Sequence, residues 1–377
     1  MNNLEEVINI LSVANISIFK DFLDIVYIFP PTLFLGIICM VGRLDMLELF
    51  FERNADLNHI DALGKTPLHI ACFFQHIEII HFLIENGVNI NAKNYEGITP
   101  LHDACANGYI NIIILLINKC CDINARANDM VTPLHVATIN NHIDVIPILT
   151  QRGANLESKD AAGLTALHYA CEDDFYAMAA STLLDEKANI EARTNNKKTP
   201  IHYACKNGSF EILQLLVKCK ANLNATALND KNALHFAAYY NHPDICIFLI
   251  NKGMNPNLKD KKGKTALSHY GYKSFFPISS SQKSNNIKIL KDAYEAYLQK
   301  IRDENWDRRS AFMMTMVDAG FHPLDKKRKA DKELQEQLDK KIKLPLISRK
   351  TKKDNEAYLV SQVFSQEVNV KTIGGYL

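Results

Sequence analysis

The sequence has almost no net charge. It contains 43 Lys and Arg residues against 42 Asp and Glu residues, which gives a formal net charge of +1. Residues 1–196 are nevertheless acidic, with 24 acidic and 11 basic side chains, whereas residues 197–377 contain 18 and 32. The near-zero total therefore hides an asymmetry between the two halves of the chain.

The sequence also lacks an uninterrupted apolar run long enough to cross a membrane. Its most apolar stretch, residues 25–41, is broken by Pro30 and Pro31, whereas a spanning helix needs about 20 apolar residues. The first residues, MNNLEEV, are acidic, unlike the basic start of a signal peptide. The nine cysteines include no CxxC pair, which favours reduced thiols. We expect a cytoplasmic protein without a membrane span.

The motifs of common enzyme classes are absent. The sequence contains no GxxxxGK[ST], GxGxxG, GxSxG or HExxH. Its densest carboxylate cluster, Glu172-Asp173-Asp174, is consecutive, so its members do not share one helix face, and we interpret it as an exposed helix end. We therefore predict no enzymatic activity, no cofactor, no metal and no small-molecule substrate.

What the sequence does contain is a repeat. The four-residue segment TPLH, or a close variant, recurs at a nearly constant interval, and only the step from Thr165 to Thr199 is longer than the others, by a single position. An apolar segment such as HIEIIHFLIENG and a turn such as VNINA follow each copy. The copies begin at Thr66, Thr99, Thr132, Thr165, Thr199, Asn232 and Thr265. This constant spacing indicates stacked structural repeats.

The pattern resembles the ankyrin repeat, whose signature is TPLHxA with a period of about 33 residues. The resemblance covers about residues 33–271 and implies an all-α solenoid of about eight units with helical caps at both ends. The first unit is degenerate, as expected of a capping repeat, because Leu33 takes the Thr position and Gly36 the His position. The predicted organisation is an N-terminal helical cap (1–32), the repeat array (33–271), a helical extension (272–323), a basic polar linker (324–354) and a C-terminal helical segment that folds back on the extension (355–377).

Physical chemistry explains why particular residue types recur at fixed positions of the repeat. The Thr is expected to cap the first helix, and Pro at the first helical position loses no hydrogen bond. Glycines in the connecting turn are expected to supply positive φ; they are Gly64, Gly97, Gly163 and Gly263. Where glycine is missing, we expect the left-handed residues within Asn128-Asp129, Asn195-Asn196 and Asn229-Asp230. The longer interval predicts a lengthened turn between Cys171 and Leu183.

Six histidines occupy the fourth motif position, and the resemblance implies that they bind neighbouring backbone and not a metal. Four cysteines recur at one repeat position, where we expect small buried side chains; they are Cys72, Cys105, Cys171 and Cys205. The adjacent pair Cys120-Cys121 leaves redox sensing as an alternative.

The resemblance also implies that a protein partner binds on the concave side, at the turn tips and just after the first helices. The candidate residues at these positions are Phe73, Phe74, Tyr95, Glu96, Asn128, Asp129, Ile139, Asn140, Lys198, Lys206, Tyr239, Tyr240, Lys261 and Lys262. The pairs Phe73-Phe74 and Tyr239-Tyr240 are not required by the repeat, and aromatic residues are favoured in interfaces. Alternatively, these pairs pack on the N-terminal cap and the C-terminal extension. Acidic residues 172–174 and the later lysines favour a partner with matching polarity.

The C-terminal extension is predicted to contain helices over about 287–304 and 306–319, the second ended by Gly320. The basic run that follows resembles a nuclear-import signal; it consists of Lys326, Lys327, Arg328 and Lys329. A nuclear regulatory role is therefore one alternative function. Nucleic-acid binding is not expected, because no aromatic residues are interleaved with the basic ones to stack on bases.

The C-terminal segment supports another alternative. The extension resembles those of ankyrin proteins from single-celled eukaryotes, and its end is similar to the truncated F-box-like tails with which some viral ankyrin proteins recruit a ubiquitin ligase. The matching residues are Phe364, Glu367, Val368, Ile373, Tyr376 and Leu377. Ser365 stands where that motif has Pro, and Ile373 is one residue out of register. A ubiquitin-ligase substrate adaptor is thus the second alternative to a binding scaffold.

Overall fold

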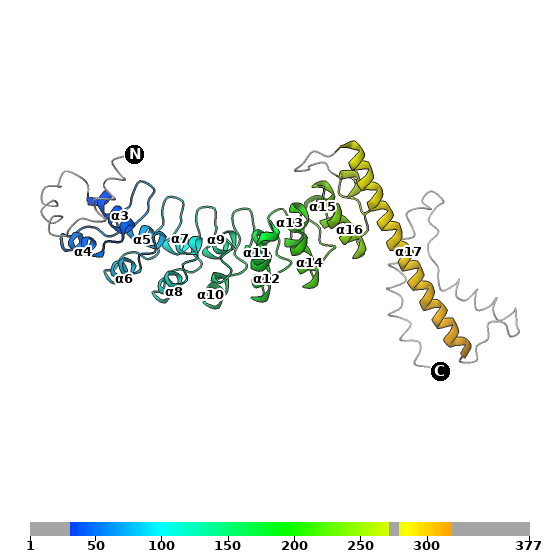
Figure 1. The fold of residues 1–377 in the computed structure, drawn as a ribbon, viewed down its shortest axis with the longest axis horizontal. Helices are drawn as coiled ribbons and strands as arrows, with labels where there is room; N and C mark the ends of the chain where they lie inside the picture. Colours follow the sequence, from blue (N-terminus) through cyan, green and yellow to red (C-terminus); the bar gives the residue numbers. More distant parts are fainter. Residues whose placement is uncertain (1–30, 271–278, 319–377) are drawn as a thin grey trace. The chain divides into compact units, whose positions relative to one another are not determined.

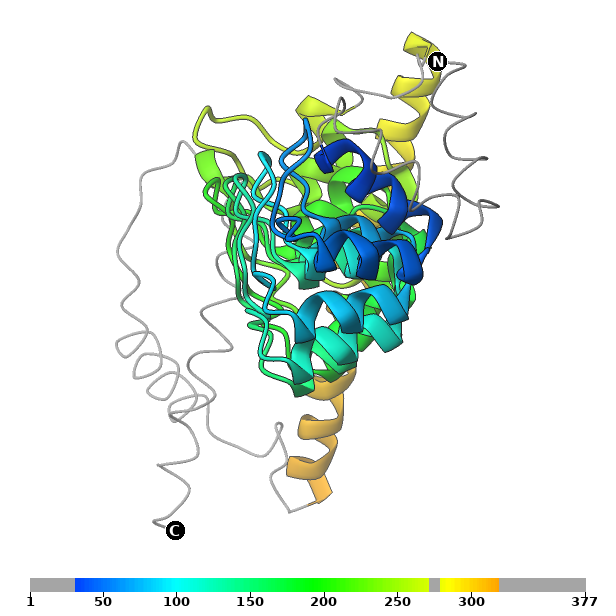
Figure 2. The ribbon, with the colours of Figure 1, turned by 90° about the vertical axis from the view of Figure 1, so that its left-hand side faces the viewer.

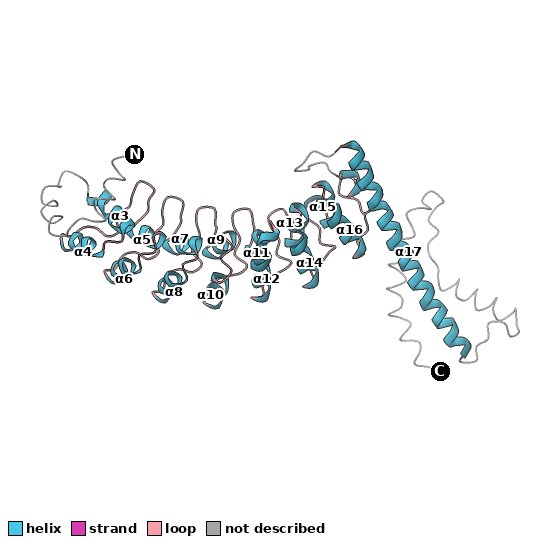
Figure 3. Ribbon diagram, in the orientation of Figure 1, coloured by secondary structure: helices cyan, strands magenta, loops and turns pink. Residues whose placement is uncertain are grey.

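The structure, a computed structural model, describes residues 31–270 and 279–318, and the side chains of residues 34–270 and 279–303. The described residues form helices and turns without a strand (Figure 3), so the predicted all-α fold is confirmed. The chain divides into two units, Met1–Arg302 and Asp303–Leu377. The contacts discussed below all lie in the first unit.

Residues 31–251 form seven helix pairs. The first helices of the pairs are α3 (Pro31–Val41), α5 (Pro67–Phe73), α7 (Pro100–Asn107), α9 (Pro133–Ile139), α11 (Ala166–Ala170), α13 (Pro200–Asn207) and α15 (Ala233–Tyr239). The second helices are α4 (Leu44–Glu52), α6 (Ile77–Glu85), α8 (Ile110–Asn118), α10 (Val145–Gln151), α12 (Ala177–Asp185), α14 (Phe210–Lys218) and α16 (Pro243–Asn251). Single 3₁₀ turns are found at η1 (Asp174–Tyr176), η2 (Leu228–Asp230) and η3 (Leu267–His269).

The pairs stack in sequence order. Each first helix packs against the first helix of the next pair from α3 to α15, and the long turns project from one side of the stack (Figures 1 and 2). The contacts are therefore between neighbours in sequence, as in other repeat arrays. The predicted solenoid is confirmed.

The core lies between the two helices of each pair and between successive pairs. The motif leucines are almost fully covered, as at Leu68 and Leu101, which are each 1% exposed. The four cysteines of the repeat position are 0% exposed, as expected of small core side chains. Burial raises the pKa of the Cys72 thiol, so these thiols are poor nucleophiles.

The motif His closes a capping box at the start of each first helix from α5 to α15. In α5 the backbone N–H of Thr66 donates to Nδ1 of His69 (3.1 Å), and the Thr66 hydroxyl oxygen lies 2.8 Å from the same nitrogen. Because Nδ1 accepts, the ring proton is on Nε2, which donates to the carbonyl of Ile98 in the next unit (3.0 Å). The implied structural role of the histidines is thus confirmed.

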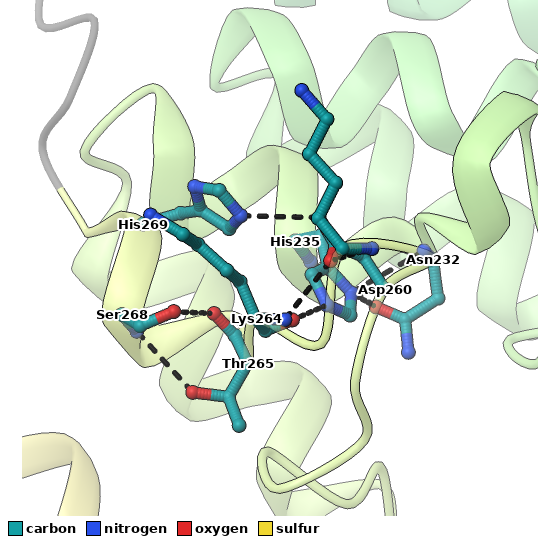
Figure 4. Close-up of polar contacts among 8 residues, drawn as sticks. Asn232, His235, Asp260, Lys264, Thr265, Ser268 and His269 are labelled. Carbon is teal, nitrogen blue, oxygen red and sulfur yellow. Dashed lines mark hydrogen bonds and ion pairs between the residues drawn. The ribbon is translucent and has the colours of Figure 1, made fainter.

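The same pair of bonds recurs along the array, with Nε2 to carbonyl distances of 3.2, 3.2, 3.1 and 3.3 Å from His102, His135, His168 and His235. Figure 4 shows the last copy, in which Asn232 replaces Thr and accepts the N–H of His235 (3.1 Å). Burial lowers the pKa of His69, His102, His168 and His202 to about 4 and also lowers that of His135 and His235. The array is therefore built on neutral imidazoles.

The turn glycines have the expected left-handed backbone, with φ between +72° and +82° at Gly64, Gly97, Gly163 and Gly263. Two of the three alternatives were misplaced. The left-handed residues of those turns are Met130 and Lys197, which occupy the glycine position itself, and only Asn229-Asp230 was predicted correctly. Turn geometry thus fixes the position of the strained residue even where its side chain is not favourable.

A second set of glycines contacts histidines of the next unit. A Cβ atom on Gly42, Gly108 or Gly208 would lie 2.5 Å from the ring of His76, His142 or His242, respectively. Those rings in turn bond the backbone of the preceding unit; His142 Nε2, for example, lies 2.9 Å from the Ala106 carbonyl oxygen. Glycine is required there both by its positive φ and by the close approach of the ring.

The longer interval contains the predicted lengthened turn, which is the 3₁₀ helix η1. The Asp173 carboxylate accepts the N–H of Phe175 (2.8 Å) and so caps this turn. The neighbouring Asp174 carboxylate accepts the N–H of Ile212, in the first turn of α14 (3.0 Å). The acidic run is therefore more than an exposed helix end, because two of its carboxylates hold backbone N–H groups.

The two predicted helices of the extension are wrong; the structure contains one helix, α17 (Ser280–Asp318). It begins earlier than expected because Ser279 and Gln282 form a capping box, with N–H to side-chain distances of 3.1 and 3.0 Å. The start of α17 covers the end of the array. Leu290 is fully buried, and the Tyr294 hydroxyl donates to Asn255 Oδ1 (3.1 Å).

The remaining domain predictions lie partly outside the described residues. Most of the N-terminal cap, the basic linker and the C-terminal segment fall within residues 1–30 and 319–377. The five domain boundaries therefore stay predictions.

Replacing Gly108 with Ala should destabilise the array more than replacing Gly87 with Ala. Both glycines have positive φ, which costs roughly 1–2 kcal/mol for a residue with a Cβ. Only at Gly108 does the added Cβ meet a ring, that of His142, whereas nothing lies within 4 Å of it at Gly87. Urea unfolding followed by circular dichroism measures the difference, and an equal loss in the two variants would contradict the packing described.

The buried histidines predict that acid destabilises the array. Their folded pKa, about 4 at His102, lies below the ordinary value of about 6.5. The stability they contribute is thus present above about pH 6.5 and is lost as the pH falls towards 4; for His102 the loss at pH 5 is about 2 kcal/mol. His102→Gln, which can keep the capping box, should show a shallower fall in urea midpoint from pH 7 to 5 than wild type. His81→Gln, at an exposed position, is the control and should follow wild type.

Candidate functional site

The candidate residues gather on one surface, which we call the inner-helix face: the long turns together with the C-terminal ends of the first helices. Tyr95, Glu96, Asn128, Asp129, Lys198, Lys261 and Lys262 belong to the turns, and Phe73, Phe74, Ile139, Asn140, Lys206, Tyr239 and Tyr240 to the helix ends. All are exposed except Lys198, Lys206, Tyr239 and Tyr240, which are partly buried.

The turn tips are held together by the backbone. Asn128 N–H donates to the Glu96 carbonyl (2.9 Å), and Ala161 N–H donates to the Asp129 carbonyl (2.8 Å). Equivalent bonds of 2.9 to 3.2 Å join the other neighbouring tips, from Leu63 to Lys261. The tips thus form a ladder whose geometry is set before any partner arrives, and a preorganised surface loses less entropy on binding.

Several of the predicted polar side chains form hydrogen bonds with the backbone of this surface. The Asn128 side-chain amide donates to the Tyr95 carbonyl (2.8 Å), and Asp129 Oδ1 accepts the N–H of Val131 (3.1 Å). The Asn140 amide donates to the Val136 carbonyl, in the preceding helical turn (2.9 Å). These side chains therefore stabilise the surface, and each retains fewer free groups for a ligand.

The aromatic candidates differ in how much of their surface is free. Tyr95 is 65% exposed, and Phe73 and Phe74 are each 43% exposed with their rings 5.2 Å apart. Tyr239 and Tyr240 also contact each other, at 5.1 Å, but are partly buried. Tyr239 lies against His269 of η3. The turn tips and the N-terminal end of the face thus offer the more exposed aromatic surface.

Sequence reasoning missed the residues that follow the motif His. Tyr169, Tyr203 and Phe236 occupy this position in three successive units, and each ring lies edge-to-face on the motif His of the preceding unit, at 5.8, 5.4 and 5.3 Å. The signal was available, because the aromatic residues recur one position after His at the repeat interval. These positions lie in the first helix and not among those usually free for binding in the repeat.

Lysines lie over these rings. Lys198 Nζ is 5.4 Å from the Tyr203 ring centre and 5.3 Å from that of Phe236, and Lys206 Nζ is 5.7 Å from Tyr203. Lys231 Nζ lies 5.2 Å from the ring centre of Tyr239. Burial, together with the charges of Lys206 and Lys231, lowers the pKa of Lys198. The ammonium groups of Lys206 and Lys231 are therefore close enough to act on that of Lys198.

The other end of the face contains a buried carboxylate that was also missed. Asp103 on α7 is 8% exposed, its Oδ1 lies 3.8 Å from Lys65 Nζ, and its Oδ2 has no hydrogen-bond partner in the described protein. Burial raises the pKa of Asp103 to about 6, although Lys65 opposes the shift. Lys65 also lies 5.3 Å from the Phe73 ring centre.

The two vicinal cysteines differ in exposure. Cys120 is exposed and has a left-handed backbone, whereas burial raises the pKa of its neighbour Cys121 to about 12. A thiol with so high a pKa is rarely ionised and reacts slowly.

Within residues 34–270 and 279–303 no group of three or more His, Cys, Asp or Glu side chains could hold a metal ion. Among the helices that the structure describes, none is both long enough and apolar enough to span a membrane.

Family models match the residues that form the repeats. Residues 2–94, 35–127, 92–160 and 134–227 match the family model for ankyrin repeats (3 copies), and residues 216–269 match that for ankyrin repeats (many copies). The ankyrin repeat domain of human ASB11, known from its crystal structure, is 26% identical; the match covers 54% of this chain and 91% of that one, with a TM-score of 0.49. No curated protein matches the chain.

Replacing Asp103 with Asn should stabilise the protein at pH 7. The folded carboxyl has a pKa near 6, above the ordinary value of about 3.9, so the wild type loses stability as the pH rises from about 4 to about 6. Asn keeps the shape without the buried charge, and we expect a gain of about 1–2 kcal/mol at pH 7 that disappears near pH 4. Urea midpoints at both pH values measure it, with the exposed Asp129→Asn as control. Loss of stability at pH 7 would show that the ion pair with Lys65 dominates.

Proposed function

Because this chain belongs to the ankyrin repeat family, whose members generally serve as protein–protein interaction modules, we propose that it is a non-catalytic scaffold that binds a protein partner on the inner-helix face. Affinity comes from burying exposed aromatic side chains against a partner, and the ladder of turn tips holds the surface in its binding geometry. The proposal includes the turn tips and the helix ends as one binding surface.

The observation that carries this proposal is the exposure of large side chains that the repeat does not require. Phe73, Phe74 and Tyr95 belong to neighbouring units and are each at least 43% exposed, although the fold uses none of them in its core. Ile139, two units further along, is 38% exposed. A row of exposed apolar side chains on a rigid surface is typical of an interaction site.

Two alternatives concern other parts of the chain. A ubiquitin-ligase adaptor would use the F-box-like C-terminal residues, and a nuclear regulator would use Lys326 to Lys329. Both groups lie outside the described residues, so the two roles stay hypotheses, as does a location in the cytoplasm or the nucleus. They differ from the scaffold in the part of the chain that binds, and this difference can be tested.

The test is quantitative co-purification with the full-length protein as bait. A Phe73→Ala, Phe74→Ala double variant should lose its main partner by about tenfold or more, because aromatic truncation at an interface centre costs roughly 2 kcal/mol or more. Met178→Ala is the matched control: Met178 is 64% exposed but lies on the second helix α12, away from the inner-helix face. It should capture the partner as wild type does.

Two results would contradict the scaffold. If the partners are retained by the double variant and by Tyr95→Ala but lost when residues 319–377 are removed, the C-terminal part of the chain binds them. If Met178→Ala loses the partner as strongly as the double variant, the second-helix side is the interface. Circular dichroism spectra and urea midpoints of all variants establish that each is folded.

A further inference from the structure

Three lysines of the inner-helix face form a cluster that contains hydrogen-bond donors without acidic partners. Lys198 and Lys231 lie at the bases of neighbouring turns, and Lys206 lies near the end of α13. Among the described residues no carboxylate forms an ion pair with any of the three, whereas Lys65 of the same face has such a partner in Asp103. Such a concentration of unneutralised positive charge is unfavourable unless something supplies negative charge.

Aromatic rings hold the cluster in place. Lys198 Nζ lies over the rings of both Tyr203 and Phe236, and Lys206 Nζ also lies over the ring of Tyr203. The rings attract the ammonium groups by cation–π interaction but accept no hydrogen bond from them in return. The groups that a ligand meets here are therefore mainly donors.

Two pairs of residues at equivalent positions of the array can be compared. Lys65 and Lys198 each stand immediately before the motif Thr of their units, and Asp103 and Phe236 each stand immediately after the motif His of the following unit. The pair Lys65 and Asp103 and the pair Lys198 and Phe236 thus occupy equivalent positions of the array. At the first pair the lysine meets a carboxylate at 3.8 Å; at the second a ring replaces the carboxylate. The fold accommodates an acid opposite this lysine, and the Lys198 position lacks one.

The acidic side chain on which Lys206 acts does not neutralise the cluster. This residue is Glu172, which is exposed and lies just after α11, the first helix of the preceding unit. It nevertheless lies beyond ion-pair distance of all three lysines. One carboxylate at the edge leaves the sum of the four charges at about +2, since lysines remain protonated near neutral pH.

We propose that Lys198, Lys206 and Lys231, with Tyr203 and Phe236, form the binding site for an acidic segment of a protein partner, whose Asp and Glu carboxylates accept hydrogen bonds from the ammonium groups. This inference rests on the proposed function and names the chemistry of the partner. The complementary charges fix where the segment lies, because the exposed Lys261 and Lys262 extend the positive surface to the next turn tip. The flexible side chains of Lys261 and Lys262 speed the encounter with an acidic segment more than they fix its bound geometry.

The probe is a fluorescein-labelled peptide of alternating Glu, Asp, Ser and Gly residues, and its control has Gln and Asn in place of the acids. Fluorescence anisotropy with the full-length protein at physiological salt should show binding of the acidic peptide only. The triple variant Lys198→Gln, Lys206→Gln, Lys231→Gln should bind it about tenfold or more weakly, because charge-assisted hydrogen bonds are lost. Phe236→Asp, which imitates Asp103, should weaken binding as well, because the cluster then has its own carboxylate.

Lys252→Gln is the matched control. Lys252 also lies over a ring, that of Phe248 at 5.5 Å, but at the end of the second helix α16. This variant should bind as wild type does. If the triple variant binds normally, or Lys252→Gln loses as much, the proposal is overturned. It is overturned equally if single-stranded DNA of the same charge binds as tightly and with the same dependence on the three lysines, because the cluster then attracts any polyanion.

These results are separate from those that test the scaffold itself. If a natural partner is lost by the Phe73, Phe74 variant while the acidic peptide fails to bind, the site for an acidic segment is rejected and the scaffold stands. If no partner depends on the inner-helix face but the peptide binds through the three lysines, the scaffold as proposed is rejected.

Discussion

The structure depends on one interaction that recurs in nearly every unit: a neutral imidazole shared between two neighbouring repeats. The motif His accepts a backbone N–H at the start of its own helix and donates to a carbonyl of the next unit, as His69 does to Ile98. One side chain therefore caps a helix and fixes the position of the next turn. Because the bond needs an unprotonated ring, the array depends on the burial that keeps the histidine pKa low.

The geometry of the proposed binding surface follows from this arrangement. Once each turn is fixed to the preceding unit, the tips meet and bond to one another through their backbones, as Asn128 does with Glu96. Some side chains at the tips, such as that of Asn128, bond within the surface. The other side chains at the tips and helix ends vary in character along the array. Apolar side chains such as Phe73 and Tyr95 are exposed in the early units, whereas lysines over aromatic rings dominate the later ones.

This gradient gives the charge asymmetry of the sequence a structural meaning. The early lysine of the face, Lys65, is compensated by Asp103, and the later one, Lys198, is not. Since both pairs occupy equivalent positions, the difference is a substitution on a constant framework and not a change of fold. A repeat array can in this way place different chemistry at equal positions, because each unit is supported mainly by its neighbours.

The sequence by itself determined the fold, because the spacing of the TPLH motif, the positive-φ glycines and the buried cysteines each express a local rule that recurs along the array. It did not place the left-handed residues Met130 and Lys197, since turn geometry overrides the preference for asparagine. It also missed that α17 is one helix.

Only the tertiary structure decided which side chains share a surface. Lys198, Tyr203 and Phe236 lie in different parts of two repeats, and Asp103 meets a lysine of the preceding unit. Sequence spacing along one unit cannot show these contacts, because they are made between units, and their strength depends on burial that only the packed array provides.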